Sequence, residues 1–105
     1  MSHFPNPAEK NLTLFEHTVS VFGHASQIVK ASEEYAEVAA AIARAFNDDT
    51  DAALKDMAAE MADAEIMRQQ LCLIFPSLPG YLEVAYRMKM EAIAKRTEFQ
   101  GRLDL

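Results

Sequence analysis

Apolar residues recur at intervals of three and four along most of the chain, which is the spacing of one face of an α-helix. This pattern predicts two long helices over residues 24–46 and 52–75, joined by a short turn over 47–51. Asp49 or Thr50 is positioned to cap the second long helix. Because the connection is short, we expect the two helices to be antiparallel neighbours.

Two shorter helices are expected at the ends of the chain. The first should run over residues 13–22, with Thr13 as N-cap and Glu16 completing a capping box. Gly23 either ends this helix or is tolerated inside a longer one. The last helix should run over residues 79–99, because proline is tolerated in a first turn.

The long helices are too apolar for one small chain to cover. The first carries a stripe predicted to form core (Ile28, Ala31, Tyr35, Val38, Ile42 and Phe46), and the second is apolar on several sides. A helix that is apolar on several sides must be covered on several sides. The expected fold is therefore an all-α helical bundle, whose four-helix core is completed by dimerisation, with a tetramer as the alternative.

Composition narrows the class of protein. The 105 residues suit a single domain, 1–105, with a loose lead-in over 1–11 and a linker over 76–80. The net charge of −6 and the lack of a basic run argue against nucleic acid as a partner. Cys72 is the only cysteine, and neither a signal peptide nor a membrane-spanning run is evident, so we expect a cytoplasmic protein without a membrane partner.

Two acidic clusters interrupt the apolar pattern of the long helices. Glu34 and Glu37 share one face of the first helix with Glu33 beside them, and Glu60 and Asp63 share one face of the second. Both clusters lie at similar distances from the connecting turn, so they should meet at the same height. Carboxylates that converge repel one another unless a cation offsets their charge.

The residue types favour one class of metal over another. A di-iron carboxylate site in a helical bundle would use Glu-x-x-His motifs. None of the histidines follows a glutamate by three positions, so an oxygen-only site for Mg²⁺, or alternatively Mn²⁺, is expected. The other interpretation, common for charge-rich helices, is that the first cluster is a solvated helix face.

The two clusters together resemble the signature of a known superfamily. The sequence Glu33-Glu34-x-x-Glu37, then 22 residues, then Glu60-x-x-Asp63 is similar to the motif of the all-α nucleoside triphosphate pyrophosphohydrolases, the MazG-like superfamily that includes the dimeric dUTPases. Gly23 and Gln27 before the first cluster agree with it, and the run over 62–67 resembles small phage and bacterial members. The resemblance spans about residues 22–98.

This resemblance implies hydrolysis of a nucleoside or deoxynucleoside triphosphate to the monophosphate and pyrophosphate, for example in control of the nucleotide pool. The implied metal ligands are Glu34, Glu37, Glu60 and Asp63. The implied catalytic residues are Glu33, as a further ligand or water-orienting carboxylate, and Lys30. The implied substrate-binding residues are Gln27, Lys30, Lys89 and Arg96.

Several alternatives remain open at the level of sequence. Lys30 has an equally weighted interpretation as a salt-bridge partner of Glu34, and an exposed position is the default for Gln27. Phe22 and Tyr35 are candidates for stacking on a base, although Tyr35 lies on the predicted core stripe. The whole chain can also be a non-catalytic dimeric interaction or regulatory protein, or a metal-dependent hydrolase of the wider superfamily with another phosphate substrate.

Overall fold

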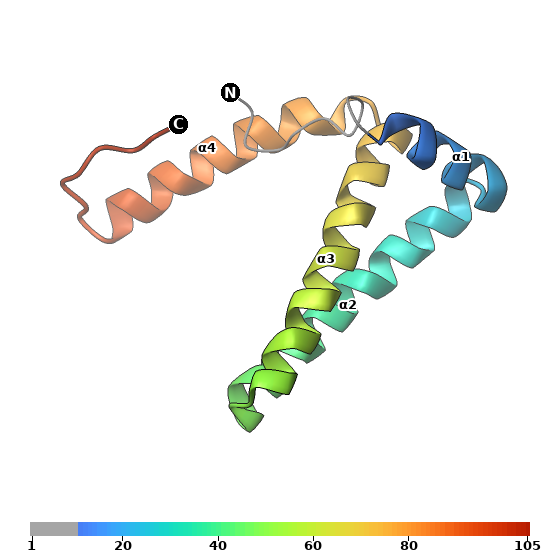
Figure 1. Cartoon of the computed structure of the whole chain (residues 1–105). Coiled ribbons are helices and arrows are strands. Elements are labelled where there is room, and N and C mark those ends of the chain that lie inside the picture. The colour runs from blue at the N-terminus through green and yellow to red at the C-terminus, as the bar shows by residue number, and fades with distance from the viewer. Residues whose placement is uncertain (1–10) are drawn as a thin grey trace.

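The computed structural model describes residues 11–105, and the regular structure of this part of the chain is entirely helical (Figure 1). The helices are α1 (Leu12–Phe22), α2 (His24–Asp48), α3 (Asp51–Ile74) and α4 (Leu78–Arg96). The all-α prediction is therefore confirmed, whereas the lead-in falls outside the described residues except for Asn11. No described helix is both long enough and apolar enough to cross a bilayer.

Helices α2 and α3 run antiparallel and form the main packing contact of the chain (Figure 1). Asp49 closes α2 in the left-handed conformation with φ 48°, and its N–H donates to the carbonyl of Ala45. The hydroxyl of Thr50 then accepts from the N–H of Ala53 at 3.1 Å, which caps α3. The predicted turn and its Thr50 cap are confirmed.

The start of α1 differs from the prediction. Asn11 occupies the N-cap position, and its carbonyl accepts from the N–H of Phe15 at 2.9 Å. Thr13 lies inside α1, so its prediction as an N-cap was wrong: Leu12 is already helical, which moves the cap two residues upstream. Gly23 ends α1 with φ 85° and ψ 155°, a region almost reserved for glycine, and so separates α1 from α2.

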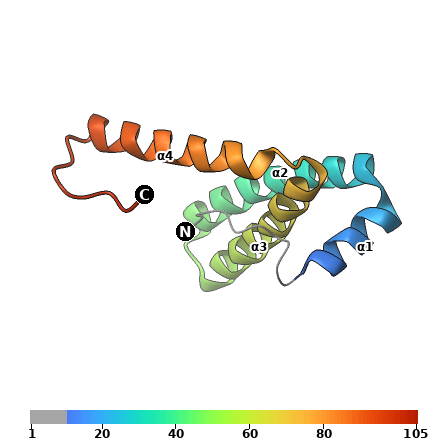
Figure 2. The same ribbon diagram turned by 90° about the horizontal axis from the view of Figure 1, so that it is seen from above.

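Helix α4 begins at Leu78 and ends at Arg96, whereas the sequence predicted a helix over residues 79–99. The expected linker over 76–80 is therefore partly helical. Glu98, at φ 53°, stands beyond the end of the helix. Among the described helices α4 contacts only α3, and it extends away from the α2–α3 pair (Figures 1 and 2). The radius of gyration of 16.4 Å exceeds the roughly 13 Å typical of a compact domain of this length.

The faces of α2 are arranged in the opposite way to the sequence-based expectation. Most of the predicted core stripe is exposed: Phe46 is 85 % and Ile42 50 % exposed, and Tyr35 is exposed as well. The buried positions of α2 are Gln27, Ala31, Glu34 and Ala41, of which only Ala31 belongs to that stripe. Small and polar side chains therefore face α3, and the apolar face points outward. The dimer that would cover it stays a prediction.

Candidate metal centre

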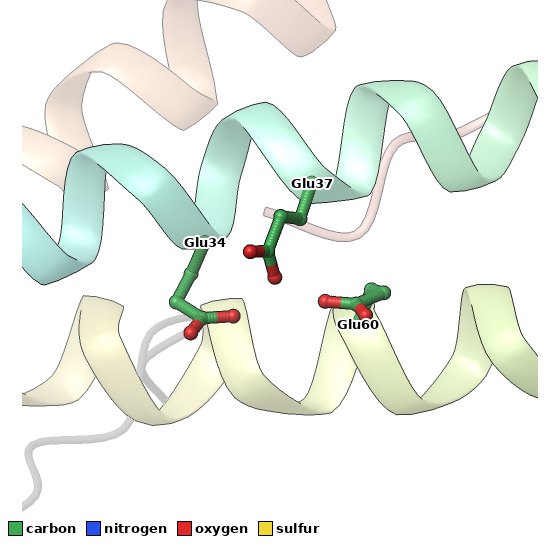
Figure 3. Close-up of side chains that lie close together, drawn as sticks. All are labelled: Glu34, Glu37 and Glu60. Carbon is green, nitrogen blue, oxygen red and sulfur yellow. The ribbon is translucent and has the colours of Figure 1, made fainter.

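Three glutamates from two helices converge between α2 and α3 (Figure 3). Glu34 and Glu37 lie one turn apart on α2 and point toward α3, from which Glu60 points back. One carboxylate oxygen of each lies within 4.8 Å of those of the other two. These residues are called the glutamate cluster below. Glu34 and Glu37 are three residues apart, so they share one face of α2. Glu37 and Glu60 lie at similar distances from the Thr50 turn, so the two helices bring them together, as the sequence predicted.

The glutamate cluster contains carboxylate oxygens that no described group satisfies. Glu34 is 7 % exposed, and Glu60 is half-buried. The Oε2 atoms of both are buried with no hydrogen-bond partner in the described part of the chain. A buried oxygen without a partner is destabilising by about 1–3 kcal/mol, and more when it carries charge. Three converging carboxylate oxygens could hold a metal ion.

The charges of the glutamate cluster act most clearly on Glu37. A hydrogen bond with Glu60 raises the pKa of the Glu37 carboxyl above its ordinary value, and the negative charges of Glu34 and Glu60 raise it further. Two carboxyl groups can share such a bond only when one of them holds a proton. A raised pKa means that Glu37 keeps its proton to a higher pH than an isolated glutamate does.

Lys30 lies one turn before the cluster on α2. Its ammonium Nζ donates to Glu34 Oε1 at 3.1 Å, which leaves Glu34 Oε2 as the oxygen without a partner. This hydrogen bond and the charge of Glu34 raise the pKa of Lys30, with a smaller contribution from Glu33 and Glu37. The salt-bridge interpretation of Lys30 is therefore confirmed in this state. The lysine side chain is still 56 % exposed, so its charge is accessible from solvent.

The other residues predicted for the site do not belong to the glutamate cluster. Asp63 is outside the group of converging oxygens, and Glu33, the residue before Glu34 in the chain, is exposed. Lys89 and Arg96 lie on α4, which makes no contact with α2. Their prediction as substrate-binding residues therefore depends on an assembly that brings α4 to the site.

A pocket of about 370 Å³ opens next to the glutamate cluster, between α1, α2 and α3. The residues that line it are Thr18, Phe22, Ser26, Gln27, Lys30, Glu34, Asp63, Ile66, Met67 and Gln70. Gln27 is only 3 % exposed, so its default interpretation as an exposed residue was wrong. A larger hollow of about 480 Å³ beside α1, lined by Glu16 and His24 among others, contains none of the predicted site residues.

Gln70 is the pocket residue that sequence reasoning missed. It follows Asp63 by seven residues, which places it two turns further along the same face of α3. That periodicity was a usable signal, because the face already carried Glu60 and Asp63. Burial was not readable from the sequence: Gln70 is 4 % exposed, although glutamine is usually a surface residue.

The fold and the site define an all-α protein with a carboxylate cluster between two antiparallel helices. Comparisons of the chain with protein-family models, with curated proteins and with solved structures found no match. We therefore infer a function from the residues of the site.

Proposed function

We propose that the chain is a Mg²⁺-dependent nucleoside triphosphate pyrophosphohydrolase that works as a homodimer, with Mn²⁺ as the alternative cation. The observation that carries the proposal is the glutamate cluster, in which Glu34, Glu37 and Glu60 present converging oxygens beside an open pocket. Helices that were merely acidic on the outside would not bury two carboxylate oxygens without partners. The motif resemblance noted above points to the same chemistry.

Each residue of the site has a role in this proposal. Glu34, Glu37 and Glu60 would hold the cation, with Asp63 completing the set from the pocket wall. When bound, Mg²⁺ supplies neutralisation of phosphate charge and activation of water. Glu33 is exposed next to the ligands, where a carboxylate can accept a proton as general base. The exposed ammonium of Lys30 offsets negative charge on the leaving pyrophosphate.

The test is a screen for pyrophosphate release from canonical and modified ribo- and deoxyribonucleoside triphosphates with Mg²⁺ or Mn²⁺. We expect turnover of at least one nucleotide by the native protein. Glu37→Gln and Asp63→Asn should each lower kcat/KM by at least about a hundredfold, since each removes a charged ligand of the cation. Both variants should stay folded, and Glu37→Gln should be more stable than the native chain without metal, because it relieves carboxylate repulsion.

Glu91→Gln is the matched control, since Glu91 is exposed on α4 and lies outside the glutamate cluster. It makes the same change of charge and should keep full activity. Absence of turnover across the whole panel, together with a melting temperature that does not respond to Mg²⁺ or Mn²⁺, would refute the enzyme proposal.

A non-catalytic helical interaction protein is the second candidate. The observation that favours it is the large exposed apolar surface, which includes Phe46, Tyr81 and Met88. The same surface is expected of the subunit of a dimeric enzyme, so it does not separate the two candidates. The pyrophosphate screen does, because an interaction protein would give no turnover.

A further inference from the structure

The pocket of about 370 Å³ beside the glutamate cluster, called the nucleotide-side pocket below, has two chemically different ends. Glu34, Lys30 and Asp63 form a charged end that adjoins the glutamate cluster. Phe22, Met67 and Gln70 contribute to the other end, which carries apolar side chains and amides but no formal charge. The two ends are separated along α2 by the seven residues from Gln27 to Glu34, which is a rise of about 10 Å.

Gln70 is the unusual residue of the uncharged end. Its side chain lines the pocket, it is 4 % exposed, and its Oε1 is buried with no hydrogen-bond partner among the described residues. Gln27 lines the same pocket from α2 and is 3 % exposed. A buried amide oxygen without a partner destabilises a protein, so its retention calls for a ligand that donates to it.

We infer that the uncharged end of the nucleotide-side pocket binds a nucleobase and that Gln70 is a residue that determines which base is accepted. A primary amide presents an acceptor and a donor side by side, which matches the edge of a base that carries an N–H beside an acceptor. The half-exposed Ile66 and the largely exposed Phe22 offer apolar surface to the flat faces of the base. This inference rests on the proposed function, which it deepens by naming the part of the substrate that is recognised.

Other occupants of the uncharged end agree less well with its residues. A phosphate group requires cationic or N–H donors, and the cation that lines the pocket is Lys30, at the opposite end. A purely apolar ligand would leave the Gln70 oxygen without a partner. A planar heterocycle with an N–H group satisfies both the amide and the apolar side chains.

The experiment measures the binding of nucleosides, which carry no phosphate, to metal-free protein by ligand-observed saturation-transfer NMR. The probes are adenosine, guanosine, cytidine, uridine and their deoxy forms. We expect one nucleoside to bind best, with stronger transfer to its base protons than to its ribose protons. Gln70→Met keeps the length of the side chain and removes the amide, so it should weaken this binding about tenfold or more.

Gln69→Met is the matched control, because Gln69 is the next residue on α3 and does not line the pocket. It should leave binding unchanged. Gln70→Met should also raise the melting temperature of the ligand-free protein, since it replaces an amide with a buried unpaired oxygen by an apolar group of similar shape. If Gln70→Met loses binding and is also more stable than the native chain, misfolding does not explain the loss, and Gln70 acts in recognition of the ligand.

The outcomes distinguish this inference from the function on which it rests. Equal weak binding of all nucleosides, or binding that Gln70→Met does not change, overturns the assignment of Gln70 even if pyrophosphate is released. Selective nucleoside binding that Gln70→Met abolishes supports the base pocket even if no triphosphate is hydrolysed. In that case the proposed function fails and the pocket remains a nucleobase site.

Discussion

The raised pKa of the Glu37 carboxyl makes the stability of the glutamate cluster sensitive to pH. Because the folded chain raises the pKa of Glu37, the native state holds a proton that the unfolded state has already released. The stability of the metal-free protein therefore falls as pH rises from the ordinary glutamate range through the raised pKa. A divalent cation competes with the same proton, so its affinity should rise over the same interval.

Urea unfolding with a chelator at a series of pH values, at fixed protein concentration, checks this sign. The native chain should lose stability as pH rises above the ordinary glutamate range, whereas Glu37→Gln should show a flatter profile because it has no proton to lose there. Adding Mg²⁺ should restore stability most at the upper end of the series. A native profile parallel to that of Glu37→Gln would contradict a raised pKa at Glu37.

For single residues, the sequence predicted which glutamates converge, but it did not predict which polar side chains are buried. Glu34, Glu37 and Glu60 converge because helical spacing and the position of the turn are readable from the chain. Gln27 and Gln70 could not be assigned to a buried pocket, because a glutamine has the same place in the pattern whether water or another helix covers it. Asp63 shares the predicted face of Glu60 but lies outside the group of converging oxygens.

At the scale of the helices, Gly23 separates α1 from α2, and its backbone conformation is the clearest local constraint on the fold. Its φ of 85° and ψ of 155° are unfavourable for any residue with a Cβ, although no atom lies within 4 Å of the position that a Cβ would occupy. Gly23→Ala should therefore destabilise the chain by about 1–3 kcal/mol through backbone conformation alone. Gly80 also has an open Cβ position but lies within α4, so Gly80→Ala should stabilise by about 0.5–1 kcal/mol. Chemical denaturation measures both, and similar shifts for the two variants would rule out strain at position 23.

The sequence predicted the helices and the short turn between α2 and α3. It did not predict which face of α2 packs against α3. Periodicity identifies an apolar stripe and assumes that it faces the rest of its own chain. In α2 the residues that face α3 are Gln27, Ala31, Glu34 and Ala41, because the glutamate cluster occupies that side. The stripe with Ile42 and Phe46 is left exposed. A pattern in one sequence does not distinguish a face buried within the chain from one buried by a partner.

For the molecule as a whole, the exposed apolar faces and the isolated position of α4 favour a second copy as partner. No residue of α4 is buried, and Tyr81 and Met88 are 72 % and 64 % exposed. Basic residues outnumber acidic ones on α4, and the reverse holds on α2 and α3. A partner's α4 laid against the α2–α3 pair would match both apolar surface and charge, and it would bring Lys89 and Arg96 toward the phosphate end of the site.

Analytical ultracentrifugation over a range of concentrations tests this arrangement. The native chain should sediment as a dimer, or as a tetramer. Ile42→Glu and Met88→Glu should each weaken association by about 1.5–3 kcal/mol, since each removes a large apolar side chain from the interface. Gln100→Glu adds the same charge outside the helices and should leave association unchanged. A native monomer at every concentration would leave the apolar faces without the partner inferred here.

The single residue between α1 and α2, Gly23, also joins two walls of the nucleotide-side pocket. Thr18 and Phe22 form its wall from the α1 side of Gly23, and Gln27 and Lys30 form it from the α2 side. We therefore expect the two backbone torsion angles of Gly23 to influence the width of the pocket. Gly23→Ala should alter nucleoside affinity as well as stability. An unchanged affinity in that variant would mean that packing against α3, rather than the glycine, fixes the wall.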